Sequence, residues 1–277
     1  MITQHNVINE PVSEYSQLTI TLDDVNNVTW CAFKNRQQAC FTQALLDELS
    51  ISQDNFTNNH NHNFFVISSE NQSVFSLGGD LVLFKNLILQ QNRKSLYQYM
   101  KQCIDAIYGL SIMPACEGIA LVQGTAFGGG FETALACDTI IAEECATFGF
   151  PDRLFNSFPG MGAYSYLSRK INPSMAQKII RSARTYTAKE LYDMGIVDKL
   201  VPAGEGVKAV NDHIANYNRY SNSYDALKQI FQAANPVDYN ELLRIGELWV
   251  NTVLRLSEKD LALMERLAAS QNSLLNH

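Results

Sequence analysis

The stretch GTAFGGGFETAL, residues 124–135, contains three consecutive glycines followed by a phenylalanine and a glutamate. Consecutive glycines forfeit side-chain packing and cost backbone entropy on folding, so they indicate a place where bare backbone is needed. One interpretation is that Gly128, Gly129 and Gly130 allow a helix and a strand to cross closely. The other is that their N–H groups meet a ligand at the start of a helix.

A second glycine turn occurs in SLGGDL, residues 76–81, after a short apolar run. Asp80 is suited to begin the helix that follows, because a carboxylate accepts hydrogen bonds from the exposed N–H groups of a first helical turn. A strand, a glycine turn and a helix are therefore predicted twice. Two unshielded N–H groups from separate turns can form an oxyanion hole, which stabilises a carbonyl oxygen as it gains negative charge.

Two carboxylates favour the catalytic interpretation of the glycine triplet. Glu132 falls in the first turn of the helix that the glycines open, in an apolar stretch where burial raises a carboxyl pKa toward the range useful for proton transfer. Asp152 follows in FGFPDRLF, residues 148–155. Alone, Asp152 is typical of a helix N-terminus. Together the two residues form a candidate pair for moving protons to and from adjacent carbons.

The composition narrows the class of protein. The chain has 277 residues, a net charge of −7 and 46% hydrophobic residues, which disfavours nucleic acid or an anionic membrane as its main partner. It contains no apolar run of about 18 residues, the length that predicts a membrane span. The polar N-terminus does not resemble a signal peptide, so we expect a cytoplasmic location. The six cysteines are scattered among apolar neighbours and are expected to be buried reduced thiols.

The order of the patterns predicts an α/β protein. Residues 17–33 read as a hairpin whose turn is Asn26-Asn27, a pair that tolerates the positive φ of a tight turn, and residues 52–62 as a polar loop. We expect a core over residues 1–204, which carries the active site, and a helical region over residues 205–277. Amphipathic helices are predicted in that second region at 205–219, 223–233 and 237–273.

Other catalytic signatures do not match. The sequence has no G-x-S-x-G elbow, P-loop lysine motif or G-x-G-x-x-G fingerprint. His60 and His62 have a spacing that a metal ion can use, but a polar surface loop explains them as well. We therefore expect no metal ion and no redox cofactor.

Several segments, in order and spacing, resemble the crotonase, or enoyl-CoA hydratase/isomerase, superfamily over nearly the whole chain. They are SLGGDL, ALVQGTAFGGGFETALACD (120–138), FGFPDRLFNSFPGMGAYSYL (148–167) and TAKELYDMGIVDKLVP (187–202). With the tail GELWVNTVLRLSEKDLALMERL (246–267), the sequence is most similar to the bacterial diffusible-signal-factor synthases of the RpfF type. The resemblance implies a crotonase-like spiral of ββα units with C-terminal helices that close the pocket and contribute to oligomer contacts.

The resemblance also implies roles for individual residues. Gly79 and Gly129 match the oxyanion-hole donors for a thioester carbonyl, Glu132 matches the first catalytic glutamate, and Asp152 falls at the second. The substrate is expected to be an acyl-CoA or an acyl-carrier-protein thioester. The expected assembly is a trimer or hexamer, and a regulatory sensor kinase is an expected partner.

The synthases dehydrate a 3-hydroxyacyl thioester to a cis-2-enoyl thioester and hydrolyse the thioester, which releases a fatty-acid quorum-sensing signal. Dehydration removes a C2 proton, which a stabilised enolate makes acidic, and the second carboxyl, Asp152, can supply the proton that the departing hydroxyl needs. Asp152 is one methylene shorter than the usual glutamate. Two alternatives therefore stay open: an enoyl-CoA hydratase or isomerase of fatty-acid metabolism, and a catalytically weakened acyl-binding or regulatory protein.

Further residues are candidates for substrate binding. Lys34 and Arg36 fall where hydratases often have residues near the coenzyme A phosphates, although an exposed basic loop explains them equally. An acyl tunnel can be lined by apolar side chains, and plain core packing is the competing interpretation. The candidates for that lining are Leu77, Phe127, Phe131, Met161, Leu248 and Trp249.

Overall fold

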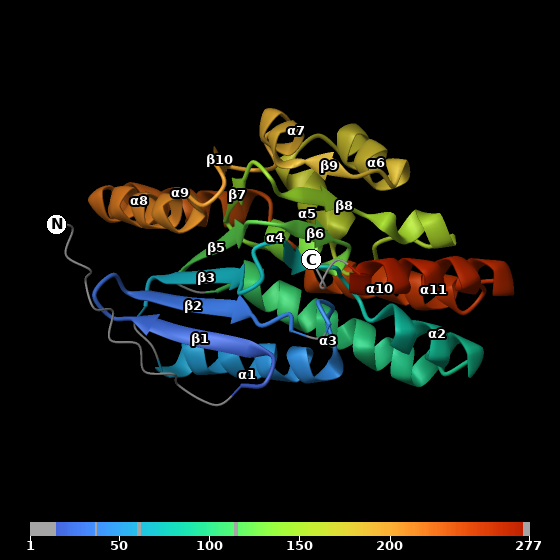
Figure 1. Cartoon of the computed structure of the whole chain (residues 1–277). Coiled ribbons are helices and arrows are strands. Elements are labelled where there is room, and N and C mark those ends of the chain that lie inside the picture. The colour runs from blue at the N-terminus through green and yellow to red at the C-terminus, as the bar shows by residue number, and fades with distance from the viewer. Residues whose placement is uncertain (1–14, 37, 60–61, 114–115, 274–277) are drawn as a thin grey trace.

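The computed structural model describes residues 15–36, 38–59, 62–113 and 116–273. Its centre is a six-stranded sheet with the order β1-β2-β3-β5-β7-β10 (Figure 1). The bounds are β1 Leu18–Asp23, β2 Val28–Phe33, β3 Phe64–Ser69, β5 Glu117–Val122, β7 Thr139–Glu143 and β10 Lys199–Val201. β1 and β2 form the predicted antiparallel hairpin, and every other pair in this sheet is parallel.

A second sheet of four short strands has the order β4-β6-β8-β9. Its strands are β4 Val74–Ser76, β6 Thr125–Phe127, β8 Thr147–Gly149 and β9 Tyr186–Thr187. β3, β5 and β7 lie in the large sheet, and the strand that follows each of them lies in the small one. The chain therefore repeats a strand, a strand and a helical segment, and the repeats form a spiral.

The helices cover both faces of the large sheet (Figure 1). Side chains alternate between faces along a strand: Phe65 and Ile67 of β3 pack in the main core with α1 and α3, whereas Phe64 and Val66 pack against α8. The helical segments are α1 Gln43–Asn59, α2 Leu81–Leu89, α3 Arg93–Ser111, α4 Gly129–Ala136, the 3-10 helix η1 Pro151–Phe155, α5 Ala163–Lys170, α6 Pro173–Ser182, α7 Ala188–Asp193, α8 Gly206–Arg219, α9 Ser221–Ala234, α10 Tyr239–Val253 and α11 Glu258–Ser273.

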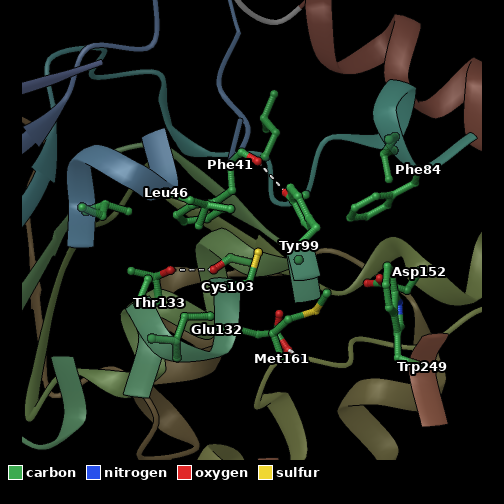
Figure 2. Close-up of a pocket in the computed structure, with 18 of the residues that line it drawn as sticks. Phe41, Leu46, Phe84, Tyr99, Cys103, Glu132, Thr133, Asp152, Met161 and Trp249 are labelled. Carbon is green, nitrogen blue, oxygen red and sulfur yellow. Dashed lines mark hydrogen bonds between the residues drawn. The ribbon is translucent and has the colours of Figure 1, made fainter. Parts of the chain in front are cut away.

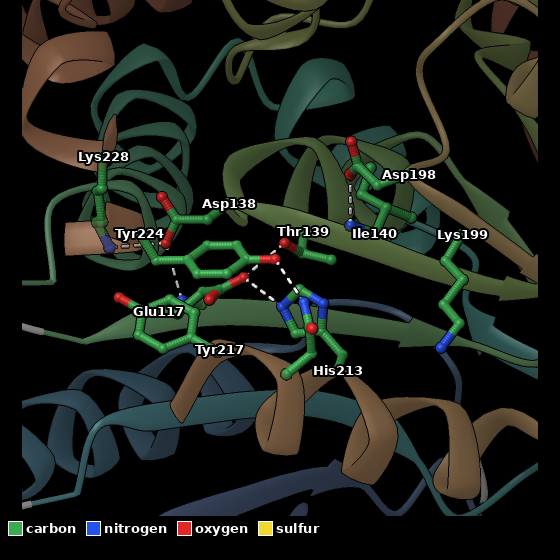
Figure 3. A network of polar contacts seen from close by, with 12 residues as sticks. Glu117, Asp138, Thr139, Ile140, Asp198, Lys199, His213, Tyr217, Tyr224 and Lys228 are labelled. Atoms are coloured by element: carbon green, nitrogen blue, oxygen red, sulfur yellow. Dashed lines mark hydrogen bonds and ion pairs between the residues drawn. The ribbon is translucent and has the colours of Figure 1, made fainter. Parts of the chain in front are cut away.

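A polar network attaches α8 and α9 to the sheet (Figure 3). Glu117 Oε1 accepts a hydrogen bond from Thr139 Oγ1 at 2.6 Å and pairs with His213 Nε2 at 2.7 Å. Lys228 of α9 forms an ion pair with Asp138 at 2.7 Å. These contacts lie on the sheet face opposite α1 and α3.

The structure corrects three local predictions. The prediction of a loop over 52–62 is wrong for residues 52–59, which belong to α1. Phe56 of this helix is buried against the sheet. The expected single helix over 237–273 is two helices, and Ser257 N–H and Oγ donate to Asp260 where the second begins. The hairpin connection is residues 24–27 rather than the pair Asn26-Asn27, because Asp23 pairs with Val28, and of the predicted pair only Asn27 has a positive φ, at 57°.

The division at residue 204 stays a prediction. Its second part corresponds to α8–α11, which are the helices after β10. Within the described ranges, no helix combines the length and apolar character that crossing a membrane requires.

Candidate active site

The two glycine turns meet at one place because the strands that precede them are neighbours. β4 pairs with β6 in parallel, so the turns at their carboxyl ends lie together. Gly78 has a φ of +93°, and a Cβ on it would lie 2.9 Å from Gly129 N and 2.9 Å from Phe127 O. A side chain at Gly78 would therefore push the turns apart.

The N–H of Gly79 points away from Phe41, which pairs with the turn in an isolated bridge. Phe41 N–H donates to Gly78 O at 2.8 Å. In a trans peptide the C=O and the N–H point in opposite directions, so the Gly79 N–H points to the side opposite Phe41. The turn is completed by Asp80, which accepts from Leu83 N–H at 2.9 Å and begins α2 as predicted.

The N–H of Gly129 is exposed for a different reason. Gly129 is the first residue of α4, and the first N–H groups of a helix have no partner within it. Gly79 and Gly129 both line the same cavity. The geometry therefore brings the two predicted oxyanion-hole residues together, and it favours the ligand interpretation of the glycine triplet over simple close packing.

Glu132 lies one helical turn into α4 and also lines this cavity. Its side chain is 1% exposed, and Oε1 accepts hydrogen bonds from the N–H groups of Met161 and Ala163, both at 3.0 Å. Burial, followed by the charge of Asp152, raises the pKa of Glu132 to about 8, although the two N–H donors oppose the shift. Glu132 therefore holds a proton at neutral pH.

Asp152 reaches the cavity from η1. Burial raises the pKa of its carboxyl to about 6, so at neutral pH it is mainly ionised. Asp152 and Trp249 of α10 both line the cavity, and both are drawn in Figure 2. The two carboxyl groups thus carry different protonation states in one site.

The walls around these polar groups are mainly apolar. They come from α1, α2, α3 and α10 and from the segments around Phe41 and Met161. A site with apolar walls and few convergent polar groups is typical of enzymes that bind small organic substrates. The further lining residues on α1 and α3 are Leu46, Leu49, Gln53, Tyr99, Cys103, Ala106, Ile107 and Leu110.

The predicted tunnel residues divide into two groups. Leu77, Met161 and Trp249 line the cavity. Phe131 is fully buried and stacks on Phe150 instead. The prediction that Phe131 lines the acyl tunnel is therefore wrong, because the side chain packs in the core.

Phe127 and Leu248 also lie outside this cavity. Phe127 is half-buried and lines a separate depression beside Gly149. Leu248 is 60% exposed, because neighbouring residues on a helix face different directions and Trp249 occupies the inward position of α10. The tunnel role predicted for both is corrected.

Lys34 and Arg36 lie at the end of β2, and neither lines the cavity. Lys34 Nζ donates to the carbonyl of Tyr15. Arg36 is exposed and lies 3.9 Å from Glu70. Their contact with coenzyme A phosphates stays a prediction.

Several large wall residues could not be predicted from the sequence, among them Phe41, Phe84 and Tyr99. Phe84 and Tyr99 pack edge to face at 5.0 Å between ring centroids. Phe84 and Tyr99 fall on apolar faces of helices, a signal that does not separate a pocket wall from ordinary core. Phe41 precedes α1 and pairs with Gly79 in an isolated bridge.

The cysteines and histidines do not form a metal site among the residues that the structure describes. His60 lies outside these residues, and His62 Nδ1 is 2.8 Å from Thr29 Oγ1. The cysteines are free thiols, and the prediction that they are buried is wrong for Cys145, which is exposed, and for Cys40, which is half-buried. Burial raises the pKa of Cys31 to about 12.

Known sequences resemble this chain in part. Carnitinyl-CoA dehydratase of Proteus mirabilis is 33% identical over 136 residues, which cover 47% of this chain and 51% of that protein. Crotonyl-CoA hydratase of Syntrophomonas wolfei is 32% identical over 142 residues, which cover 50% of this chain and 52% of that protein. Each match thus spans about half the length of the relative.

The fold agrees with solved structures over more of the chain. The enoyl-CoA hydratase of Bacillus halodurans superimposes with a TM-score of 0.79 at 18% identity, covering 92% of this chain and all of the other. The structure of Pseudomonas aeruginosa DspI gives a TM-score of 0.68 at 21% identity, covering 85% of this chain and 95% of the other. The predicted α/β fold with a C-terminal helical region is confirmed.

The model of one protein family, described as enoyl-CoA hydratase/isomerase, matches residues 23–248, which include both glycine turns and both carboxylates. The chain therefore belongs to the enoyl-CoA hydratase/isomerase family.

Proposed function

We propose that this protein dehydrates 3-hydroxyacyl thioesters to 2-enoyl thioesters. One observation carries the proposal: Gly79, Gly129, Glu132 and Asp152 line one largely apolar cavity, with one carboxyl protonated and the other ionised near neutral pH. Elimination of water needs both states, because one group removes a proton from C2 and the other protonates the departing hydroxyl.

We assign the roles from the direction and causes of the two pKa shifts, since the pKa of Glu132 is raised both by burial and by the charge of Asp152. Asp152, with a pKa of about 6, is the base that takes the C2 proton. Glu132, with a pKa of about 8, is the acid that gives its proton to the C3 hydroxyl. This reverses the prediction from sequence, in which Asp152 supplied that proton. Since Oε1 of Glu132 already accepts two N–H bonds, Oε2 is the oxygen that carries the transferred proton.

The reaction balances without a further reactant. The electrons of the C2–H bond form an enolate, whose oxygen the N–H groups of Gly79 and Gly129 stabilise. The enolate then forms the C2–C3 double bond as the C3–O bond breaks and water leaves. Loss of one such donor typically costs about 3 kcal/mol of barrier, or about a hundredfold in rate.

We further propose that the same site hydrolyses the thioester and releases a free 2-enoic acid as a signal molecule. This step rests on the resemblance of residues 246–267 to the signal-factor synthases, and these residues form parts of α10 and α11. Trp249 places α10 against the reaction centre. A hydratase that stops at the thioester is the second candidate, favoured by the crotonyl-CoA hydratase relative.

The test uses purified full-length protein with 3-hydroxyacyl chains on coenzyme A and on acyl carrier protein. Mass spectrometry of the products separates the candidates: a free 2-enoic acid supports the synthase, and a 2-enoyl thioester without free acid supports the hydratase. Absence of water loss from every thioester, together with tight acyl binding, would favour the acyl-binding protein instead.

A further inference from the structure

Tyr99 of α3 bonds to Asp80, the residue directly after Gly79, and to Phe41, which lies beside the Gly79 turn. Its hydroxyl donates to Phe41 O at 2.5 Å and accepts from Asp80 N–H at 3.2 Å. Phe41 N–H in turn donates to Gly78 O. The C=O of the peptide that carries the Gly79 N–H is therefore held by Phe41, and the N–H of the next peptide, at Asp80, is held by the Tyr99 hydroxyl.

We propose that Tyr99 is a positioning residue, whose hydroxyl fixes the direction of the Gly79 N–H toward the thioester oxygen. The proposal rests on the function proposed above, because it assigns Tyr99 a part in that reaction. Tyr99 does not transfer a proton: its own hydrogen is donated to a backbone carbonyl, and the carboxyl groups supply the acid and the base.

The Gly79 turn needs such a support more than the Gly129 turn does. Gly78 and Gly79 are adjacent, and glycine has more backbone freedom than any other residue. The direction of the Gly129 N–H is fixed because Gly129 is part of α4. The residue before it is also fixed, since Gly128 N–H donates to Gly149 O at 2.9 Å. An oxyanion hole acts through donors that are already aligned, and a displacement of about 1 Å can cost about a hundredfold in rate.

Tyr99 is itself rigidly held. It is 2% exposed, and its ring packs edge to face on Phe84, which packs edge to face on Trp249 with 5.0 Å between centroids. The hydroxyl therefore has a fixed position relative to the turn. A competing interpretation is that the hydroxyl is merely a satisfied polar group of the core.

Tyr99→Phe separates these interpretations, because it removes the hydroxyl and keeps the ring. The matched control is Tyr217→Phe, which removes another hydroxyl of a buried tyrosine, one that donates to Asp225 Oδ1 at 2.5 Å. Tyr217 packs in the cluster on the α8 face of the sheet, away from the cavity. Both variants are compared with the wild type by thermal unfolding, by steady-state kinetics on a 3-hydroxyacyl thioester, and by hydrogen exchange of the Asp80 amide.

We expect Tyr99→Phe to lower kcat about tenfold while KM changes less than about twofold, since the donor acts on the developing enolate. The Asp80 amide should exchange about fivefold faster, as expected for the loss of one net hydrogen bond. Tyr217→Phe should change neither quantity.

If the Asp80 amide of folded Tyr99→Phe exchanges its hydrogen at the wild-type rate, the proposal is overturned. It is also overturned if that amide exchanges faster but kcat stays within twofold of the wild-type value. An equal loss of kcat in Tyr217→Phe would also overturn it, because the effect would then be general destabilisation. A wild type without turnover on any thioester would overturn the proposed function. The exchange rates would still decide whether Tyr99 holds the turn.

Discussion

Glu132 and Asp152 are electrostatically coupled across the cavity, although α4 carries one and η1 the other. Burial and, after it, the Asp152 charge raise the pKa of Glu132 to about 8, whereas burial raises that of Asp152 to about 6. Between about pH 6 and pH 8 one carboxyl is mainly protonated and the other mainly ionised, which gives the site an acid and a base at the same pH.

This difference predicts a bell-shaped pH profile for kcat/KM of dehydration. Activity should rise as Asp152 ionises near pH 6 and should fall as Glu132 loses its proton near pH 8. The initial rate of water loss, measured between about pH 5 and pH 9, tests this prediction. A rate that keeps rising through pH 8 would show that ionised Glu132, and not its acid form, is the active species.

Glu132→Gln should make the protein more stable at alkaline pH. The raised pKa of Glu132 means that the folded state holds its proton more tightly than the unfolded chain does. The stability from this proton is complete below the unfolded pKa, near 4.5, and is lost as the pH rises through about 8. Because glutamine cannot ionise, the variant should melt several degrees higher than the wild type at about pH 9 and nearly equally at about pH 4.

Calorimetric melting at both pH values measures this difference. The control is Glu144→Gln, which removes a carboxylate that is exposed to solvent. A stability difference between Glu132→Gln and the wild type that stays constant with pH would contradict the buried, proton-bearing state of Glu132.

Lengthening the second carboxylate tests whether Asp152 limits the reaction. Asp152→Glu extends the side chain by one methylene, roughly 1.5 Å, and should raise kcat if the shorter residue leaves the base too far from C2. Asp152→Asn should lower kcat by about a thousandfold and should abolish the acidic limb of the pH profile. If the wild type, Asp152→Glu and Asp152→Asn all show negligible turnover but bind an acyl ligand tightly, the result would support the acyl-binding protein.

Gly130 should not tolerate alanine. A Cβ at this position would lie 2.4 Å from Ser76 O and 2.8 Å from Ser76 Cβ, so β4 would have to move away from α4. The gain of about 1 kcal/mol in helix propensity is smaller than the typical cost of about 1–3 kcal/mol for overpacking. We expect a lower melting temperature and at least about a tenfold lower kcat, because the displaced turn carries Gly79.

Gly118→Ala is the matched control for Gly130→Ala. Gly118 is a buried glycine of β5, and a Cβ on it would meet its nearest atom at 3.6 Å, an ordinary contact. Activity and melting temperature of Gly118→Ala should stay near those of the wild type. Comparable losses in both variants would show that the β4–α4 contact has no special role.

The reaction centre could be predicted from the sequence because its determinants are local. Glycines that follow an apolar run indicate a strand, a turn and a free N–H donor within a few residues. A carboxylate in the first turn of the helix that follows indicates the acid or base. The contact between the Gly79 and Gly129 turns is not local. Only the resemblance to a family predicted that contact, and the pairing of β4 with β6 provides it.

The cavity wall could not be predicted in the same way. Trp249 and Leu248 are neighbours in the sequence, yet one is 2% exposed and the other 60%. The rotation of α10 decides this difference, and tertiary packing sets that rotation. The separation of α10 from α11 did have a local signal: Ser257 and Asp260 in SEKD form the pattern of a capping box.

Glu132 is proposed to supply the proton for water loss from an acyl thioester. The most direct test of this role compares the products that wild type and Glu132→Gln form from a mixed pool of 3-hydroxyacyl thioesters, as measured by mass spectrometry. We expect a 2-enoyl product from the wild type and at least about a thousandfold slower formation by folded Glu132→Gln. Equal rates of water loss for the two proteins would contradict this role.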